Sequence, residues 1–201
     1  MLRFAITPGE LPFGHRSSNA DALVERCASL ARAGVDVLLV REKHLAAGDL
    51  VRLCRRIAGV AKPARVLVSG RVDVALAAGL AGVHLSSAPG ELTPEQVRRL
   101  MPAAYVSVSC HTVEEMLRAR SAGASAALFA PVFGKWVDES EVVAGVGLER
   151  LREACAAAKG LPVLALGGVT AANAPACLQA GAAGVAGIRL FFSPGNQAGL
   201  A

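Results

Sequence analysis

The stretch Ala180-Gly181-Ala182-Ala183-Gly184-Val185 places a glycine where a helix is expected to end and begins an apolar strand two or three residues later. Glycine suits this position because it readily adopts the left-handed backbone conformation that closes many helices. The same shape recurs at residues 33–36, 78–83 and 122–126. Helices that pass into strands through such short links are typical of βαβ units with parallel strands.

Outward from these junctions, short apolar runs alternate with amphipathic stretches rich in Ala, Leu and Arg. Eight runs are predicted as strands: Leu2 to Thr7, Asp36 to Val40, Arg65 to Ser69, Ala81 to Leu85, Tyr105 to Ser109, Ala126 to Ala130, Pro162 to Leu166 and Gly184 to Ile188. Helices are predicted over Ala20 to Ala33, Ala47 to Val60, Thr93 to Met101, Thr112 to Ser121, Leu148 to Lys159 and Ala171 to Ala180.

These units predict an α/β fold, a single compact (β/α)8 TIM barrel over residues 1–201 with a short C-terminal tail. Eight units of roughly 25 residues reach the compact limit of this fold. A doubly wound open sheet is the alternative. No G-x-G-x-x-G motif follows the first strand, which disfavours the dinucleotide-binding form of such a sheet.

Composition narrows the class of protein. No apolar run reaches 18 residues, and the first residues lack a signal-peptide pattern, so we expect a cytoplasmic protein without membrane contact. The five cysteines are scattered, which indicates neither a disulfide framework nor a zinc site. The net charge of +5 favours an anionic ligand. Nucleic acid is not the expected partner, because the basic residues are dispersed and one Trp and one Tyr offer little stacking surface.

Polar residues gather at the expected carboxyl ends of two strands, where barrel enzymes place their active sites. Arg41 and Lys43 should point the same way, which makes them a candidate clamp for a phosphate or diphosphate. A solvated turn with locally paired charges is the alternative. Ser109 and His111 should share a face with Ser107, and an imidazole at the barrel mouth can move protons near neutral pH. The alternative for His111 is a backbone-bonding role only.

The last two strands end in glycine-rich turns. Gly167 and Gly168 follow one, and Gly187, Ile188 and Arg189 end the other. Backbone N–H groups in such turns can approach an anion, so this is the predicted phosphate site, while a tight turn without a ligand is the alternative. The stretch 131–147 is predicted as a long irregular loop, a lid or a disordered segment, and carries Lys135 as its one cation.

Motifs along most of the chain resemble the superfamily of thiamine phosphate synthases and thiazole tautomerases. In order, they are Arg41-Glu42-Lys43, Gly70 to Leu76, Gly82-Val83-His84-Leu85, Ser109 to Glu115, Pro131-Val132-Phe133, Gly167-Gly168 and Gly184-Val185-Ala186. The resemblance implies a (β/α)8 barrel of thiamine biosynthesis that binds a small phosphorylated thiazole. It leaves self-association into a homo-oligomer open.

The two branches of the superfamily differ in chemistry. Synthases join a pyrimidine diphosphate to the thiazole phosphate, release pyrophosphate and need Mg²⁺. Their two magnesium carboxylates are replaced here within Ser69-Gly70 and Ser86 to Pro89, with Glu91 the nearest substitute, and Leu39 stands where they have Gln. Tautomerases move a proton in a thiazole carboxylate phosphate without metal; His111 matches one of their two histidines, and Pro131 stands at the other.

The sequence therefore ranks three hypotheses. A tautomerase-like enzyme or diverged paralogue, with His111 as the catalytic residue and no metal or other cofactor, comes first. A synthase with rearranged magnesium ligands comes second, and a noncatalytic protein that binds a phosphorylated ligand comes third.

Overall fold

The computed structural model describes residues 1–9, 11, 18–137 and 140–193. Eight parallel strands close into a barrel in the order β1-β10-β9-β6-β5-β4-β3-β2. They are β1 (Leu2–Ile6), β2 (Val37–Val40), β3 (Arg65–Ser69), β4 (Gly82–Leu85), β5 (Tyr105–Cys110), β6 (Ala126–Phe129), β9 (Val163–Ala165) and β10 (Gly184–Gly187). The predicted barrel is confirmed, and the open-sheet alternative is wrong, because β1 pairs with both β2 and β10.

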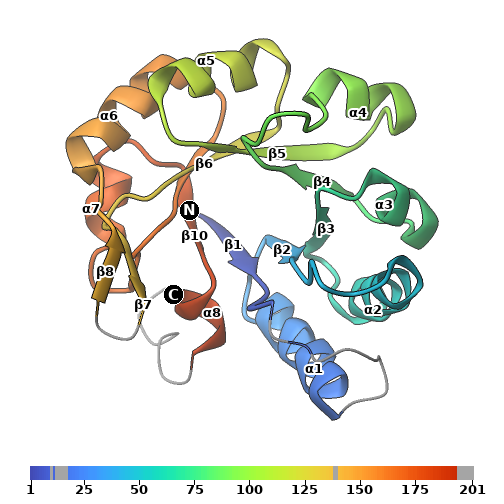
Figure 1. Ribbon diagram of the computed structural model, residues 1–201. Coiled ribbons are helices and arrows are strands. Elements are labelled where there is room, and N and C mark those ends of the chain that lie inside the picture. The colour runs from blue at the N-terminus through green and yellow to red at the C-terminus, as the bar shows by residue number, and fades with distance from the viewer. Residues whose placement is uncertain (10, 12–17, 138–139, 194–201) are drawn as a thin grey trace.

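Helices surround the strands on the outside (Figure 1). They are α1 (Ser18–Arg32), α2 (Ala47–Val60), α3 (Val72–Ala78), α4 (Pro94–Leu100), α5 (Val113–Ser121), α6 (Gly147–Ala158), α7 (Ala174–Gln179) and α8 (Arg189–Phe192). The short α3 and α8 are not among the predicted helices, because seven and four residues show little helical period and neither helix begins with a capping side chain. Residues 194–201 of the predicted tail lie outside the described residues.

The junctions between helices and strands behave as the sequence predicts. Gly34, Gly79, Gly123 and Gly181 all have positive φ angles, between 66° and 100°. At the start of α4, Thr93 accepts a hydrogen bond from the Gln96 amide, and the Gln96 side chain accepts one from the Thr93 amide. These caps fix where each helix turns back toward the barrel.

Alternation along the strands divides the apolar side chains into two layers. One set faces the barrel axis and consists of Phe4, Ile6, Val37, Leu39, Leu67, Ala126, Leu128, Leu164 and Ala186. A larger set lies between the strands and the helices and includes Val40, Val68, Val83, Val106 and Cys110. Removal of both sets from water is the main force that holds the barrel closed.

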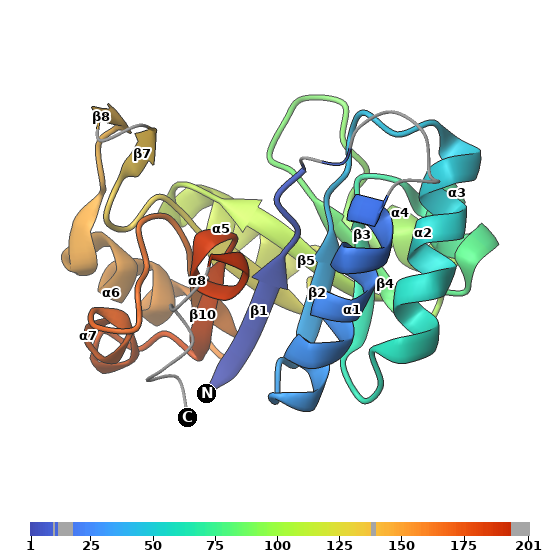
Figure 2. The same ribbon diagram turned by 90° about the horizontal axis from the view of Figure 1, so that it is seen from below.

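The stretch 131–147 is not irregular, in contrast to the prediction. Strands β7 (Lys135–Val137) and β8 (Ser140–Val143) pair antiparallel within it. Val137, Val142 and Val143 are of a residue type with high strand propensity, and they are the signal in the sequence for these two strands. The base of the hairpin is tied together, because the Val146 and Gly147 amides donate to the carbonyls of Pro131 and Val132. Figure 2 shows the hairpin on the side of the barrel toward which the strands point.

Close packing of β4 against β5 gives a first test of the barrel. A Cβ atom added to Gly82 would lie 2.0 Å from the Tyr105 carbonyl oxygen, so the two strands would have to separate. We expect Gly82→Ala to lower the free energy of unfolding by about 2–4 kcal/mol in denaturant titrations.

Gly59 on α2 is the matched control, because no atom lies within 4 Å of an added Cβ there. Gly59→Ala should stabilise the protein by roughly 0.5–1 kcal/mol, since glycine is costly inside a helix. A Gly82→Ala protein as stable as the wild type would contradict the packing of these strands.

Candidate active site

Glu42, at the end of β2, organises the loop that follows β1. Its side chain is 1% exposed. The carboxylate accepts hydrogen bonds from the Thr7 hydroxyl (2.7 Å), the Gly9 amide (3.1 Å) and the Leu11 amide (3.2 Å). A buried carboxylate needs such compensation because burial removes its hydration. Glu42 therefore fixes the β1 loop against the end of β2.

The same network positions Arg41. Its backbone amide donates to the Thr7 hydroxyl oxygen at 2.9 Å, while that hydroxyl donates to Glu42. Arg41 is partly buried and Lys43 is exposed, so both cationic groups are accessible at the barrel mouth. The Arg41 guanidinium also reaches the β1 loop, because its Nη1 would lie 3.3 Å from a Cβ atom added to Gly9. That the two cations bind a phosphate or diphosphate stays a prediction.

A histidine that sequence reasoning did not select lies inside the barrel mouth. His84 on β4 is 7% exposed, and its ring is hydrogen-bonded through Nδ1 to Ser107 Oγ and through Nε2 to Ser109 Oγ, both at 2.9 Å. Burial, followed by the positive charges of Lys43 and Arg41, lowers its pKa to about 4. The imidazole is therefore neutral at physiological pH.

A signal for His84 is present in the sequence. It is two residues from Gly82 in a strand of four buried residues, and it pairs in register with Ser107 on β5. Polar residues at paired inward positions of neighbouring strands indicate a shared hydrogen-bond network. The prediction that Ser107 and Ser109 share a face is confirmed, since both contact the same ring.

His111 lies beyond the end of β5 and is exposed. Its Nδ1–H donates to the Ala130 carbonyl oxygen at 2.7 Å, and its backbone amide donates to a Glu115 carboxylate oxygen at 2.5 Å. The first contact directs Nε2 away from the backbone of β6. The neighbouring Cys110 is buried in the outer layer, and burial raises the pKa of its thiol to about 12.

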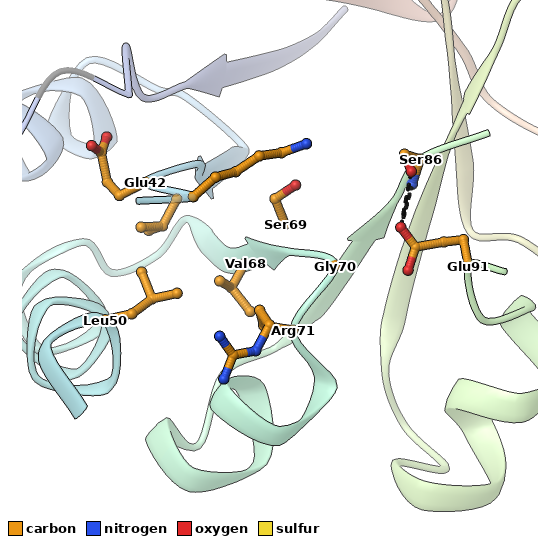
Figure 3. A pocket seen from close by; sticks show the side chains of 10 residues that line it. Glu42, Leu50, Val68, Ser69, Gly70, Arg71, Ser86 and Glu91 are labelled. Atoms are coloured by element: carbon orange, nitrogen blue, oxygen red, sulfur yellow. Dashed lines mark hydrogen bonds between the residues drawn. The ribbon is translucent and has the colours of Figure 1, made fainter. Parts of the chain in front are cut away.

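The ends of β2, β3 and β4 enclose a cavity of about 210 Å³. Polar groups of Glu42, Lys43, Ser69, Arg71, Ser86 and Glu91 line it (Figure 3). The Glu91 carboxylate accepts hydrogen bonds from the Ser86 hydroxyl (2.9 Å) and amide (3.3 Å). Its Oε2 would lie 3.6 Å from a Cβ atom added to Gly70. A carboxylate from the β4 loop thus lies beside the place that a side chain at position 70 would occupy.

Arg71 on the cavity wall already has a partner. Its guanidinium donates twice to Asp73, at 2.8 and 2.5 Å. This hydrogen bonding lowers the pKa of Asp73 to about 2. Lys43 is the other cation on the cavity wall, and Arg41 lies two residues before it in the chain.

The glycine turn after β9 is shaped by the loop after β6. Added Cβ atoms would lie 2.7 Å from Pro131 at Gly167 and 2.8 Å from Phe133 at Gly168, and both glycines have positive φ angles. The Phe133 amide donates to the Gly167 carbonyl at 2.9 Å. Packing alone therefore explains why these two residues are glycines, and the predicted phosphate site remains a prediction.

The end of β10 lies beside this turn because β10 pairs with β9. Gly187 is buried, Ile188 caps α8 and Arg189 is the exposed first residue of that helix. An added Cβ at Gly187 would lie 2.9 Å from the Leu190 side chain. Lys135 is in β7, and its side chain lies outside the described part of the structure.

Two classes of feature are missing from the described ranges. No three or more His, Cys, Asp or Glu side chains gather there into a group that could hold a metal ion. No helix in these ranges combines the length and apolar character needed to cross a membrane.

Comparison with known proteins gives a consistent result. Residues 12–191 match the family model described as thiamine monophosphate synthase. A thiamine-phosphate synthase of a Roseiflexus species is 38% identical over 176 residues, which cover 85% of this chain and 72% of the relative. A thiamine-phosphate synthase of Methanoculleus marisnigri is 36% identical over 169 residues, which cover 83% and 78%.

A solved structure shares the fold. The thiamine phosphate pyrophosphorylase from Pyrococcus furiosus superimposes with a TM-score of 0.78 at 24% identity, covering 97% of this chain and 89% of that one.

The Glu42 network predicts a large effect from a small substitution. Glu42→Gln replaces one acceptor oxygen with an NH₂ group, so one of three donors loses its partner. We expect the free energy of unfolding to fall by about 1–3 kcal/mol, measured by chemical denaturation. Exposed Glu95 on α4, paired with Arg99, is the control, and Glu95→Gln should change stability by less than about 0.5 kcal/mol. Equal stability of the two variants would show that Glu42 does not hold the β1 loop.

Proposed function

Since the chain belongs to the thiamine monophosphate synthase family, we propose that it is a transferase of thiamine biosynthesis. In the proposed reaction a pyrimidine diphosphate reacts with a thiazole phosphate. A bond forms between the two heterocyclic units, the carbon–oxygen bond to the diphosphate breaks, and pyrophosphate leaves. The names of the curated relatives support this reaction over the isomerisation that the sequence ranks first.

The positions of the two cations and of the glycine turns around the barrel mouth support the proposed reaction. Arg41 and Lys43 lie at the end of β2, while the glycine turns lie at the ends of β9 and β10, on the other side of β1 in the barrel order. The mouth thus offers one cationic and one amide-rich region, which suits two phosphorylated substrates bound side by side.

We assign the diphosphate to the cavity beside β2 and β3. A leaving diphosphate gathers negative charge as the bond breaks, and fixed positive charges stabilise that charge most effectively in a partly desolvated site. Lys43 on the cavity wall supplies a point charge, and Arg41, two residues before it in the chain, offers a fork of donors to two oxygens. Ser109, hydrogen-bonded to His84, is a partly buried neutral polar group at the end of β5.

We assign the thiazole phosphate to the turns formed by Gly167, Gly168, Gly187 and Ile188. Backbone N–H groups at such turns bind phosphate at the mouth of many barrels. Arg189 and Lys135 are the side chains that we propose to assist it, as the sequence indicates.

The cavity fits Mg²⁺ only together with a substrate. Mg²⁺ sites on phosphates use one or two protein carboxylates, with phosphate oxygens and water completing the shell. The oxygens of Glu42 are already engaged with three donors, which leaves Glu91 as the carboxylate that would hold the ion. When bound, the ion would neutralise charge on the leaving diphosphate. We propose that the free protein has no tight magnesium site.

Release of pyrophosphate tests the proposed reaction. Wild-type protein with both substrates and Mg²⁺ should produce pyrophosphate, and Arg41→Ala or Lys43→Ala should lower kcat/KM by about 10- to 100-fold, as expected from loss of a charged hydrogen bond. Arg99→Ala, an exposed arginine on α4, is the matched control and should leave kcat/KM unchanged.

The metal dependence gives a second measurement in the same assay. Glu91→Gln should raise the Mg²⁺ concentration needed for half-maximal rate. Calorimetric titration of the free protein should show no binding below roughly millimolar Mg²⁺. Absence of pyrophosphate at any Mg²⁺ concentration would overturn the synthase proposal.

An isomerase is the second candidate, and the geometry of His111 favours it. Its Nδ1–H is fixed by the Ala130 carbonyl, so Nε2 is the nitrogen that can take and return a proton. With Pro131 in place of a second histidine, His111 would act with water.

Assay of a thiazole carboxylate phosphate distinguishes this candidate. If the protein is an isomerase, His111→Gln should reduce isomerisation by at least about 10²-fold while phosphate affinity, measured by calorimetry, stays nearly constant. His44→Gln, a histidine on the β2–α2 connection, is the control for loss of an imidazole elsewhere. Binding without turnover in either assay would leave the noncatalytic ligand-binding protein as the function.

A further inference from the structure

We propose that His84 is a positioning residue that holds Ser109 as a hydrogen-bond donor directed at the ligand. The inference rests on the proposed function only in its choice of ligand, a phosphorylated heterocycle. The direction of the hydrogen bonds follows from the residues themselves and can be measured without any substrate.

Ser107 sets the direction of the chain of hydrogen bonds. Its side chain is fully buried, and within the described residues the hydrogen bond of its hydroxyl is to His84 Nδ1. A serine hydroxyl has one proton to donate, and a buried donor without an acceptor costs about 1–3 kcal/mol. The Ser107 proton therefore belongs on the line to Nδ1, which must be unprotonated to accept it.

The imidazole transmits this direction to Ser109. A neutral imidazole carries one proton, and with Nδ1 as the acceptor that proton is on Nε2. Nε2–H then donates to Ser109 Oγ at 2.9 Å. Burial keeps the pKa of His84 low, and the cations of Lys43 and Arg41 act in the same direction, so a second ring proton is not added near neutral pH.

Ser109 is thereby left with its own proton available. It is partly buried near the end of β5, nearer the mouth than Ser107, and its oxygen already receives the Nε2–H. Its hydroxyl must donate to something else, and a ligand in the mouth is the group that can accept. Ser109 therefore selects an acceptor atom, such as a phosphate oxygen or an unprotonated ring nitrogen, over a donor.

The opposite tautomer would reverse the selection. If Nδ1–H donated to Ser107, then Nε2 would accept the Ser109 proton, and Ser109 would present only lone pairs to the ligand. The buried Ser107 proton would then lack an acceptor among its described neighbours, which makes this arrangement the costlier one. The buried Ser107 therefore determines whether Ser109 presents a hydrogen-bond donor or only lone pairs to the ligand.

Nitrogen NMR of the ligand-free protein tests the inference. Long-range proton–nitrogen correlation of ¹⁵N-labelled imidazoles identifies which ring nitrogen carries the proton. We expect His84 to show protonated Nε2 and unprotonated Nδ1 from pH 8 to pH 5. A protonated Nδ1, or shifts averaged between two tautomers in the wild type, would overturn the proposal.

Variants separate positioning from general structural support. Ser107→Ala removes the donor to Nδ1 and should shift His84 toward a mixture of tautomers, whereas Ser107→Thr keeps the hydroxyl and should restore the wild-type spectrum. Ser125→Ala is the matched control, because Ser125 bonds Arg98 and the Val106 amide outside the barrel interior. If Ser107→Ala leaves the His84 tautomer unchanged, Ser107 does not set it.

Kinetics give the functional readout. Ser107→Ala should lower kcat/KM for pyrophosphate release by roughly two- to tenfold, the effect of weakening one neutral hydrogen bond, without changing the magnesium requirement. If the wild-type protein shows the Nε2–H tautomer but releases no pyrophosphate, the proposed reaction is contradicted and the role of His84 is still supported. If the protein releases pyrophosphate but His84 does not show the Nε2–H tautomer, only the proposed role of His84 is contradicted.

Discussion

The strict alternation of side chains along eight paired strands is the constraint on which this structure depends. In a closed parallel barrel, every second residue of each strand faces the axis and its neighbours face the helices. The axis is filled by Phe4, Leu39, Leu128 and their neighbours, and toward the mouth the inward positions become Ser107, His84 and Ser109. A shift of one residue in any strand would exchange the side chains that face the axis with those that face the helices.

Two buried polar groups meet this constraint in different ways. Glu42 faces the outer side, and three donors from the loop after β1 replace the water that its carboxylate loses on burial. Its charge therefore stabilises the conformation of that loop. His84 faces the axis and loses its charge instead, because burial and nearby cations favour the neutral ring. The first group keeps the cation pair of β2 in place, and the second gives the mouth a neutral, directional hydrogen-bond network beside those cations.

Glycines in this barrel mark places where backbone approaches backbone. Gly82 leaves room for β5, while Gly167 and Gly168 leave room for the loop that begins at Pro131. That loop supports the β7–β8 hairpin, and its contact with the turn after β9 joins two of the loops that form the mouth. Close packing against Pro131 and Phe133 thus requires glycine at positions 167 and 168. Binding of a phosphate by backbone N–H groups would favour glycine at the same two positions.

The sequence alone determined the barrel, and it predicted the bounds of the eight barrel strands and of six helices to within a few residues. It also placed Arg41 and Lys43 just after one of those strands. These are local or periodic properties: glycine after a helix, a capping threonine, an apolar run of four or five residues. Only the tertiary structure decided what the paired strands bring together. His84 and Ser107 are 23 residues apart in the chain, and their contact exists because β4 and β5 align them in register. In the same way, Glu91 reaches the space beside Gly70 because the loop after β4 folds back over β3. Such contacts depend on register and loop path, which no single stretch of sequence contains.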